Sequence, residues 1–333
     1  MTKLESIILN CPEYKWNWDF ISYDSNLSLK FIERFHNKLD NFYFTKNKNV
    51  NMDFIDSHKE ISWDFNSLCM NPNLTLEYIN NHKDIVWNWL LLSEHLHINE
   101  IEKDVTKPYK WYYLSFNTTL NESFVERFIN KDWRWDVLSA NNGISLEFID
   151  KYFNYPWNFM KVSENENLNI NYILNNNKLR WCWYSISKNS GIKMKDVELN
   201  KYLPWDYSAL SRNPNLDLEF LERNIHKSYD FGFLSSNKII TPKVIESYDN
   251  KPWCLYNLSK NPNLNIDFVR TYIDNYYWWN WKSLSMNSSF TMDMIEDNLD
   301  LPWDMKYVLY NPNITEDFFE KYILHSKKLK IEL

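Results

Sequence analysis

The chain has 333 residues, of which 44% are hydrophobic and 18% aromatic, and it carries 17 tryptophans but only 3 glycines. This composition supplies a hydrophobic core and excludes a disordered chain, while the shortage of glycine argues against phosphate- and dinucleotide-binding loops. The net charge of −7 argues against a nucleic-acid partner, whose binding surface normally carries a basic excess, although it leaves room for a local basic patch.

The first residues, MTKLESIILNCPEYKW, lack the apolar run of about 7–15 residues that marks a signal peptide. No stretch reaches the roughly 18 apolar residues of a membrane span. The four cysteines lie far apart without a C-x-x-C pair, which is typical of reduced thiols rather than of disulfides or a zinc site. We therefore expect a soluble, intracellular, cytoplasmic protein with no membrane partner.

An internal repeat organises most of the chain. Residues 205–220 (WDYSALSRNPNLDLEF) and 253–268 (WCLYNLSKNPNLNIDF) share one pattern, 48 residues apart. With the first Trp as position 0, the pattern recurs at a nominal spacing of 24 residues and divides residues 16–326 into thirteen repeats. Leu39, Tyr109 and Tyr229 begin repeats 2, 5 and 10. The other ten repeats begin with Trp16, Trp63, Trp87, Trp133, Trp157, Trp181, Trp205, Trp253, Trp279 and Trp303.

The two ends of the chain fit this scheme. Ile7 and Ile8 occupy positions 15 and 16 of a half-repeat, so residues 1–15 are predicted to form an N-terminal cap. Residues 327–333 make a C-terminal basic tail. We expect residues 1–333 to form a single elongated repeat domain.

Each repeat is predicted to open with a short helix, helix A. Trp at position 2, an apolar residue at position 5 and Ser at position 6 share one helical face, although W-x-W alone also alternates like a strand. A leucine-rich repeat would need an apolar position 3, which is mostly polar here, as in Asp19 and Asp136. We predict about two turns of helix, with a Pro at position −1 in its first turn in five repeats. These prolines lie in alternate repeats, so a 48-residue pair of unlike hairpins is an alternative building block.

A turn and a second helix, helix B, are predicted to follow. Position 8 is Asn in eleven repeats, and position 10 is Asn in seven and Gly in two, Gly143 and Gly191. Because Asn and Gly both tolerate the left-handed region, we expect a positive φ at position 10. Position 12 is Ser, Thr, Asn or Asp in twelve repeats, with Lys193 as the exception, which predicts a helix N-cap. The Ser and Asn positions are expected to hydrogen-bond the turn backbones.

These patterns predict an all-α fold, an α-solenoid of about thirteen 24-residue helical hairpins. A hairpin this short cannot bury its own apolar face, so neighbouring hairpins must stack. The tryptophans at positions 0 and 2 are therefore interpreted as core, and not as a platform that stacks nucleic-acid bases.

The repeat pattern resembles a known family. WDFNSLCMNPNLTLEYI from Trp63 and WDYSALSRNPNLDLEFL from Trp205 are similar to the tryptophan-repeat proteins that large DNA viruses, entomopoxviruses and mimivirus-like giant viruses, encode in multigene families. The resemblance implies a viral protein that acts in the cytoplasm of an infected cell or in the virion, and it brings no catalytic residues. Repeats 2, 4 and 10 depart most from the family pattern.

The sequence carries little that points to chemistry. His95 and His97 form the closest histidine pair, but as metal ligands they lack partners, and they replace turn residues of repeat 4. Catalytic and phosphate-binding motifs are missing. We expect no enzyme activity, no cofactor and no metal. The predicted function is protein–protein interaction, with Tyr276, Tyr277 and Trp278 as candidate contacts. A self-associating virion or assembly component is the alternative, ahead of a nucleic-acid binder, a carbohydrate binder or an enzyme.

Overall fold

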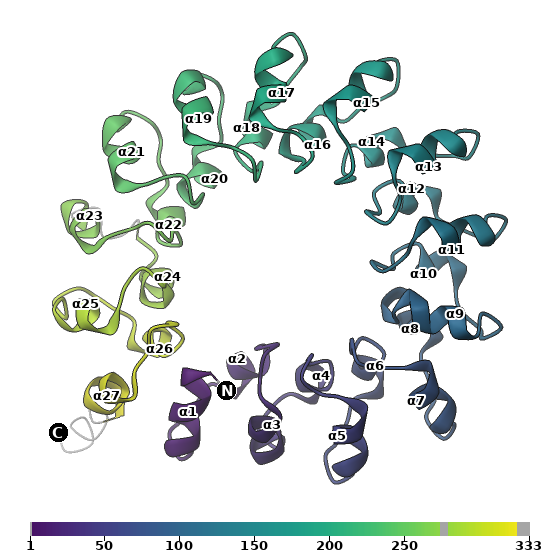
Figure 1. Ribbon diagram of the computed structural model, residues 1–333. Coiled ribbons are helices and arrows are strands. Elements are labelled where there is room, and N and C mark those ends of the chain that lie inside the picture. Colours follow the sequence, from purple (N-terminus) through teal and green to yellow (C-terminus); the bar gives the residue numbers. More distant parts are fainter. Residues whose placement is uncertain (1, 274–278, 325–333) are drawn as a thin grey trace. The chain divides into compact units, whose positions relative to one another are not determined.

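The protein is all-helical in a computed structural model that describes residues 2–273 and 279–324, where no strand occurs (Figure 1). After α1 (Lys3–Asn10), thirteen helix pairs follow one another, as the repeat pattern predicts. The A helices are α2 (Trp18–Ser22), α4 (Asn41–Thr45), α6 (Phe65–Leu68), α8 (Trp89–His95), α10 (Trp111–Leu114), α12 (Trp135–Leu138), α14 (Phe159–Val162), α16 (Trp183–Lys188), α18 (Tyr207–Leu210), α20 (Phe231–Ser235), α22 (Leu255–Leu258), α24 (Trp281–Met286) and α26 (Met305–Val308).

Each A helix is followed by a B helix. The B helices are α3 (Leu29–Phe35), α5 (Met52–Ser57), α7 (Leu76–Asn81), α9 (Ile98–Lys103), α11 (Glu122–Arg127), α13 (Leu146–Lys151), α15 (Ile170–Asn175), α17 (Met194–Leu199), α19 (Leu218–Asn224), α21 (Pro242–Ser247), α23 (Ile266–Thr271), α25 (Met292–Glu296) and α27 (Glu316–Phe318). A π-helical turn, Phe319–Leu324, continues α27. No helix in residues 2–273 and 279–324 is long and apolar enough to cross a membrane.

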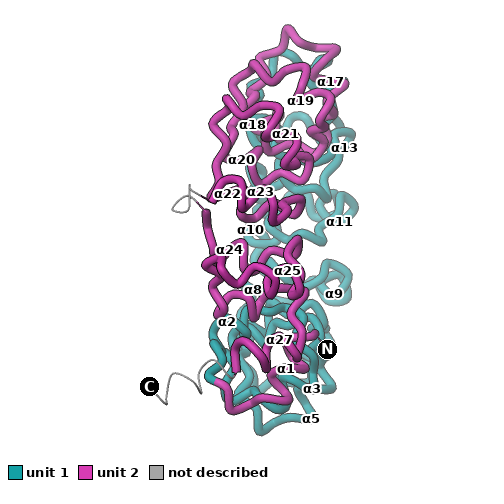
Figure 2. Tube along the Cα trace, turned by 90° about the vertical axis from the view of Figure 1, so that its left-hand side faces the viewer, with its two compact units in different colours: residues 1, 15–182 teal, residues 2–14, 183–333 magenta. Residues whose placement is uncertain are grey.

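The chain divides into two compact units (Figure 2). Unit 1 holds residues 15–182, and unit 2 holds residues 2–14 together with 183–333. Within each unit the A helices form one row and the B helices a second row beside it (Figure 1). Neighbouring A helices contact one another, for example α8 with α10 in unit 1 and α24 with α26 in unit 2.

Helix A begins later and is shorter than expected. Its N-cap lies at position 1, so positions 0 and 1 are extended and helix A starts at position 2. The prolines at position −1 thus precede the cap and do not lie in the first helical turn. At the cap of α14, for instance, Asn158 Oδ1 accepts from the backbone N–H groups of Met160 and Lys161. Helix A has four residues in all five proline-preceded repeats and up to seven elsewhere, so one turn is the rule rather than two.

Helix B begins where the sequence predicts. Position 12 is the N-cap in twelve of thirteen repeats, and in nine of them its side chain accepts the N–H of the third helical residue. Repeat 4 is the exception, because α9 starts early at Ile98 and His97 becomes its cap. His97 Nδ1 accepts from Asn99 N at 3.2 Å, so this histidine has the turn role that was weighed against a metal site.

The turn before helix B differs from the prediction. None of the described residues has a positive φ, so left-handed backbone does not explain the Asn and Gly at position 10. Instead the side chain at position 8 accepts the N–H of position 10 and closes an Asx turn, as Asn213 Oδ1 does from Asn215 N at 2.8 Å. At Gly143 the reason is steric, because a Cβ there would lie 1.9 Å from the carbonyl oxygen of Leu120 in the preceding repeat.

Positions 5, 11 and 0 build the core. Every residue at positions 5 and 11 is buried, from Ile21 and Leu27 to Val308 and Ile314. None of the sixteen described tryptophans is exposed, and six of them are at most 8% exposed. The position-0 indole also has a polar role that the sequence did not reveal, since its Nε1 donates to the carbonyl at the end of the preceding helix B. Trp157 Nε1 reaches Tyr152 O at 2.9 Å in this way.

Hydrogen bonds join each repeat to the next. The position-6 hydroxyl accepts the position-1 N–H of the following repeat, as Ser187 Oγ does from Asp206 N at 2.9 Å. The position-8 amide donates back to the preceding repeat, as Asn213 Nδ2 does to the carbonyls of Ser187 at 2.8 Å and Asn189 at 3.0 Å. The expected Ser and Asn ladders are confirmed, and they run between repeats as well as within turns.

Unit 2 includes the N-terminal helix. Asn10 Nδ2 donates to Glu316 Oε1 at 2.5 Å, and the ring of Tyr14 meets Phe319 edge-on at 5.3 Å between centroids. Ile7 and Ile8 of α1 are at most 2% exposed. The segment predicted as an N-terminal cap therefore packs on the last repeat.

Candidate interaction surface

The side chains left over from the repeat framework lie on the A row. Position 5 of every A helix is buried, whereas positions 3 and 7 are never buried and position 4 is buried only at Ser67, Ser185 and Ala209. Most of the exposed large aromatic residues of these helices occupy them. At positions 3, 4 and 7 the exposed rings of the described A row are Phe20, Tyr23, Phe42, Tyr112, Phe116, Tyr184, Phe233 and Tyr256, and Phe65 at position 2 of α6 is exposed as well. This row is the surface where composition varies from repeat to repeat while the fold stays constant.

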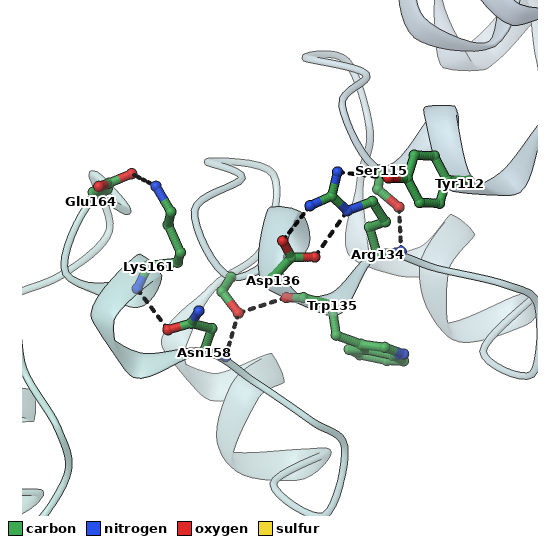
Figure 3. Close-up of polar contacts among 9 residues, drawn as sticks. Tyr112, Ser115, Arg134, Trp135, Asp136, Asn158, Lys161 and Glu164 are labelled. Atoms are coloured by element: carbon green, nitrogen blue, oxygen red, sulfur yellow. Dashed lines mark hydrogen bonds and ion pairs between the residues drawn. The ribbon is translucent and has the colours of Figure 1, made fainter.

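In unit 1 two ion pairs lie on this row, whereas Lys46 lies over the rings of Phe42 and Tyr43. Arg134 donates to both carboxylate oxygens of Asp136, at 3.1 and 2.5 Å, and to the hydroxyl of Tyr112 at 2.9 Å (Figure 3). Lys161 Nζ donates to Glu164 at 2.9 Å in the next repeat (Figure 3). The hydrogen bonds from Arg134 lower the pKa of Asp136.

The same close-up shows why these side chains are fixed. Ser115 Oγ accepts the backbone N–H of Arg134 at 2.9 Å, one rung of the Ser ladder (Figure 3). Asn158 caps α14 and so fixes the start of the helix that carries Lys161 (Figure 3). The repeat framework thus positions the outward residues of each A helix relative to those of its neighbour.

A cavity lies in unit 2. It has a volume of about 660 Å³ and is lined by aromatic and aliphatic side chains, among them Trp253, Tyr256, Phe268 and Tyr272. Among the described lining residues, Asp249 and Lys251 are charged. Residues 274–278 lie outside the described residues, and with them the predicted contacts Tyr276, Tyr277 and Trp278.

Chemistry-bearing clusters are missing from the part of the chain that the structure describes. It holds no group of three or more His, Cys, Asp or Glu that could ligate a metal. His95 and His97 occupy the end of α8 and the cap of α9. The cysteines are free thiols, and burial raises the pKa of Cys69, which replaces Ser at position 6.

Two repeats have a buried tyrosine hydroxyl where the other repeats mostly have tryptophan at position 0. Tyr109 and Tyr229 replace Trp at position 0 and are 6% and 7% exposed. Within the described residues their hydroxyl groups have no hydrogen-bond partner, and burial raises the pKa of both. A phenol carries its donor at the tip of the ring, whereas the indole N–H lies on the edge of its five-membered ring, so the phenol does not replace the bond to the preceding helix B.

The chain has no detectable relatives in the comparisons made. A scan against protein-family models gave no match, and searches of curated proteins and of solved structures gave none either. The resemblance to the viral tryptophan-repeat proteins therefore stays a prediction from the residues.

Proposed function

We propose that the chain is a non-catalytic repeat scaffold that binds a protein partner through its A row. The observation that supports the proposal is that different positions of each repeat have different structural roles. Positions 0, 5, 6, 8 and 11 are used in the core and the ladders, while positions 3, 4 and 7 present aromatic and charged side chains that differ between repeats. Exposed aromatic and arginine side chains are typical of protein-binding surfaces.

Affinity capture tests this proposal. The tagged chain is expressed in cells, and captured proteins are compared with those held by a variant in which Tyr112, Tyr184 and Tyr256 are changed to Ser. We expect specific partners with the wild-type chain and their loss with the variant, whose helical circular dichroism should be unchanged. Equal capture by both chains would rule out the A row as the binding surface.

The virion or assembly role is the second candidate function. It requires self-association, for which a stack of repeats would use its open ends. The packing of α1 on the last repeat favours the first proposal, because it covers the end on which another copy would stack. Sedimentation over a wide concentration range separates the two, since a monomer throughout would exclude self-association. A viral origin and a location in the cytoplasm or virion belong to this proposal too, on the strength of the repeat resemblance.

A further inference from the structure

The A row of unit 2 carries an unusual set of side chains. We define the unit 2 A-face as positions 3, 4 and 7 of repeats 8–13. Its eighteen residues are Tyr184, Ser185, Lys188, Ser208, Ala209, Arg212, Gly232, Phe233, Ser236, Tyr256, Asn257, Lys260, Lys282, Ser283, Met286, Lys306, Tyr307 and Tyr310, and all of them except the buried Ser185 and Ala209 are at least partly exposed. Five of them are cations and none is acidic, in a chain whose net charge is −7.

Charge is segregated between the two rows of unit 2. None of the A helices α16 to α26 contains Asp or Glu. The B helices with the final π-helical turn carry eleven acidic residues and five basic ones. The acidic residues are Asp196, Glu198, Glu219, Glu222, Glu246, Asp267, Asp293, Glu296, Glu316, Asp317 and Glu320. The basic ones are Lys195, Arg223, Lys243, Arg270 and Lys321.

The acidic residues nearest to the unit 2 A-face are already engaged. Asp206, Asp230 and Asp304 lie at position 1, where each carboxylate accepts backbone N–H groups as the N-cap of its helix. They reduce the positive potential of the face without neutralising any of its side chains.

The five cations of the unit 2 A-face have no carboxylate partner among the described residues. Arg134 and Lys161 on the A row of unit 1 do have such partners, Asp136 and Glu164. Positions 3, 4 and 7 of repeats 1–7 carry four acidic residues and two basic ones, so the positive face is confined to unit 2.

Aromatic rings lie against four of these five cations. The guanidinium of Arg212 lies 3.3 Å from the ring centroid of Phe233 in the next repeat, and Lys282 Nζ lies 5.2 Å from that of Tyr307. Lys188 and Lys260 lie over Tyr184 and Tyr256 of their own helices at 5.1 and 5.8 Å. The rings restrict the cations without neutralising them, which lowers the entropy that binding an anion would cost.

This arrangement favours an acidic polypeptide over a nucleic acid. Single strands bind by stacking bases on open aromatic faces, but here the cations occupy ring faces. Packed helices lie about 8–10 Å apart, and an extended chain advances about 3.3 Å per residue. One carboxylate at about every third residue would therefore match the spacing of the cations, which occur once in each repeat except repeat 10.

We propose that the unit 2 A-face binds an extended acidic segment of a protein partner, running across the A helices of repeats 8–13. This inference rests on the proposed scaffold function and adds the chemistry of the partner and the place where it binds.

A defined peptide tests the inference on the full chain. The probe is a fluorescein-labelled peptide of six Gly-Ser-Glu units, and the same peptide with Lys for Glu and a twelve-nucleotide oligo-dT serve as comparison probes. The test variant is R212E/K260E/K282E, and the matched control is K195E/K201E/K243E, which changes the net charge equally at exposed lysines of unit 2 away from the unit 2 A-face. Circular dichroism and thermal melting verify that both variants fold.

Fluorescence anisotropy at two salt concentrations then measures the affinity of each probe for each chain. We expect the Glu peptide to bind the wild-type chain, the Lys peptide not to bind, and the affinity to fall at least about tenfold in the test variant but less than about twofold in the control. Equal losses in both variants, no binding of the Glu peptide, or tighter binding of oligo-dT would each overturn the inference. If the test variant still captures the same cellular partners as the wild type, the scaffold function stands and this face is wrong. If the test variant loses the captured partners and the control variant keeps them, the result supports both the scaffold function and this face as the binding site.

Discussion

In the ten repeats that begin with Trp, the position-0 indole can both fill the core and donate a hydrogen bond, as Trp157 does. Trp157 is 8% exposed and meets Trp135 of the preceding repeat edge-on at 4.9 Å, so it fills the space between two repeats. Its Nε1 also satisfies the carbonyl of Tyr152 at the end of helix α13. Leucine or phenylalanine could fill space, but only tryptophan adds a donor at that distance. This explains the tryptophan content better than hydrophobicity does.

Trp157→Phe and Tyr229→Phe should therefore differ in sign. Trp157→Phe removes ring volume and leaves a carbonyl without its donor, so we expect a loss of about 2–3 kcal/mol. Tyr229→Phe removes a buried hydroxyl that has no partner, so we expect no loss or a gain of up to about 1 kcal/mol. Urea unfolding followed by circular dichroism measures both. Equal destabilisation by the two changes would show that the indole acts through its volume alone.

At the scale of elements, the unit of construction is the junction between two hairpins. At the junction of repeats 8 and 9 a hydroxyl–backbone bond, an amide–backbone bond and an aromatic contact occur together: Asp206 N to Ser187 Oγ, Asn213 Nδ2 to Ser187 O, and Trp183 against Trp205. Because all three join neighbours in sequence, repeats keep their register even where one is irregular, as in repeat 4.

Gly143→Ala tests how close two repeats must lie. A methyl group would overlap the carbonyl oxygen of Leu120 and push repeats 5 and 6 apart, which we expect to cost about 2–4 kcal/mol. Gly232→Ala is the matched control, because its Cβ would meet nothing closer than the side chain of Asp230 at 3.0 Å. Thermal melting compares the two variants, and similar melting temperatures would contradict the steric explanation.

Ion pairs between successive B helices predict a pH dependence. Glu126 accepts from Lys151 Nζ and Tyr152 OH, both at 2.6 Å, and these bonds lower its pKa. A carboxyl group with a lowered pKa stabilises the fold above its unfolded pKa of about 4.3 and loses that contribution as the pH falls through its folded pKa. Glu126→Gln should lower the melting temperature slightly at pH 7 and leave it unchanged below about pH 3. Exposed Glu147→Gln is the control, and a difference that persists at low pH would exclude this ion pair as its cause.

The sequence predicts well those structural features that recur in every repeat, because the same residue types mark them each time. The thirteen helix pairs and the position-12 caps follow from side-chain types that recur. The prediction of a left-handed turn was wrong because Asn and Gly at position 10 have different roles here. Asn215 Nδ2 donates to backbone carbonyls of the preceding repeat, whereas Gly143 lacks the Cβ that would collide with such a carbonyl. The unit 2 A-face could be read from the residues only once positions 3, 4 and 7 were known to share one surface. The net charge of the chain does not reveal this positive face, because the acidic residues of the B helices outnumber its five cations.

At the scale of the molecule, the last repeat depends on residues from the other end of the chain. In a repeat array each hairpin is stabilised by its neighbours, so an end repeat lacks one of them. In unit 2 that neighbour is α1, which places Ile7 and Ile8 in the core and bonds Asn10 to Glu316. The stability of α26 and α27 should therefore depend on a segment some 300 positions earlier in the sequence.

Ile8→Asp tests this dependence. Ile8 is fully buried, so a carboxylate there should detach α1 and uncover the apolar end of the last repeat. Hydrogen exchange followed by mass spectrometry should show lost protection in α26 and α27, while α18 and α20 keep theirs because their own neighbours are intact. Lys3→Asp, at an exposed position of the same helix, should leave every protection factor near the wild-type value. If Ile8→Asp loosened all repeats of unit 2 together, the unit would unfold as one cooperative block, and the neighbour-by-neighbour account of its stability would be wrong.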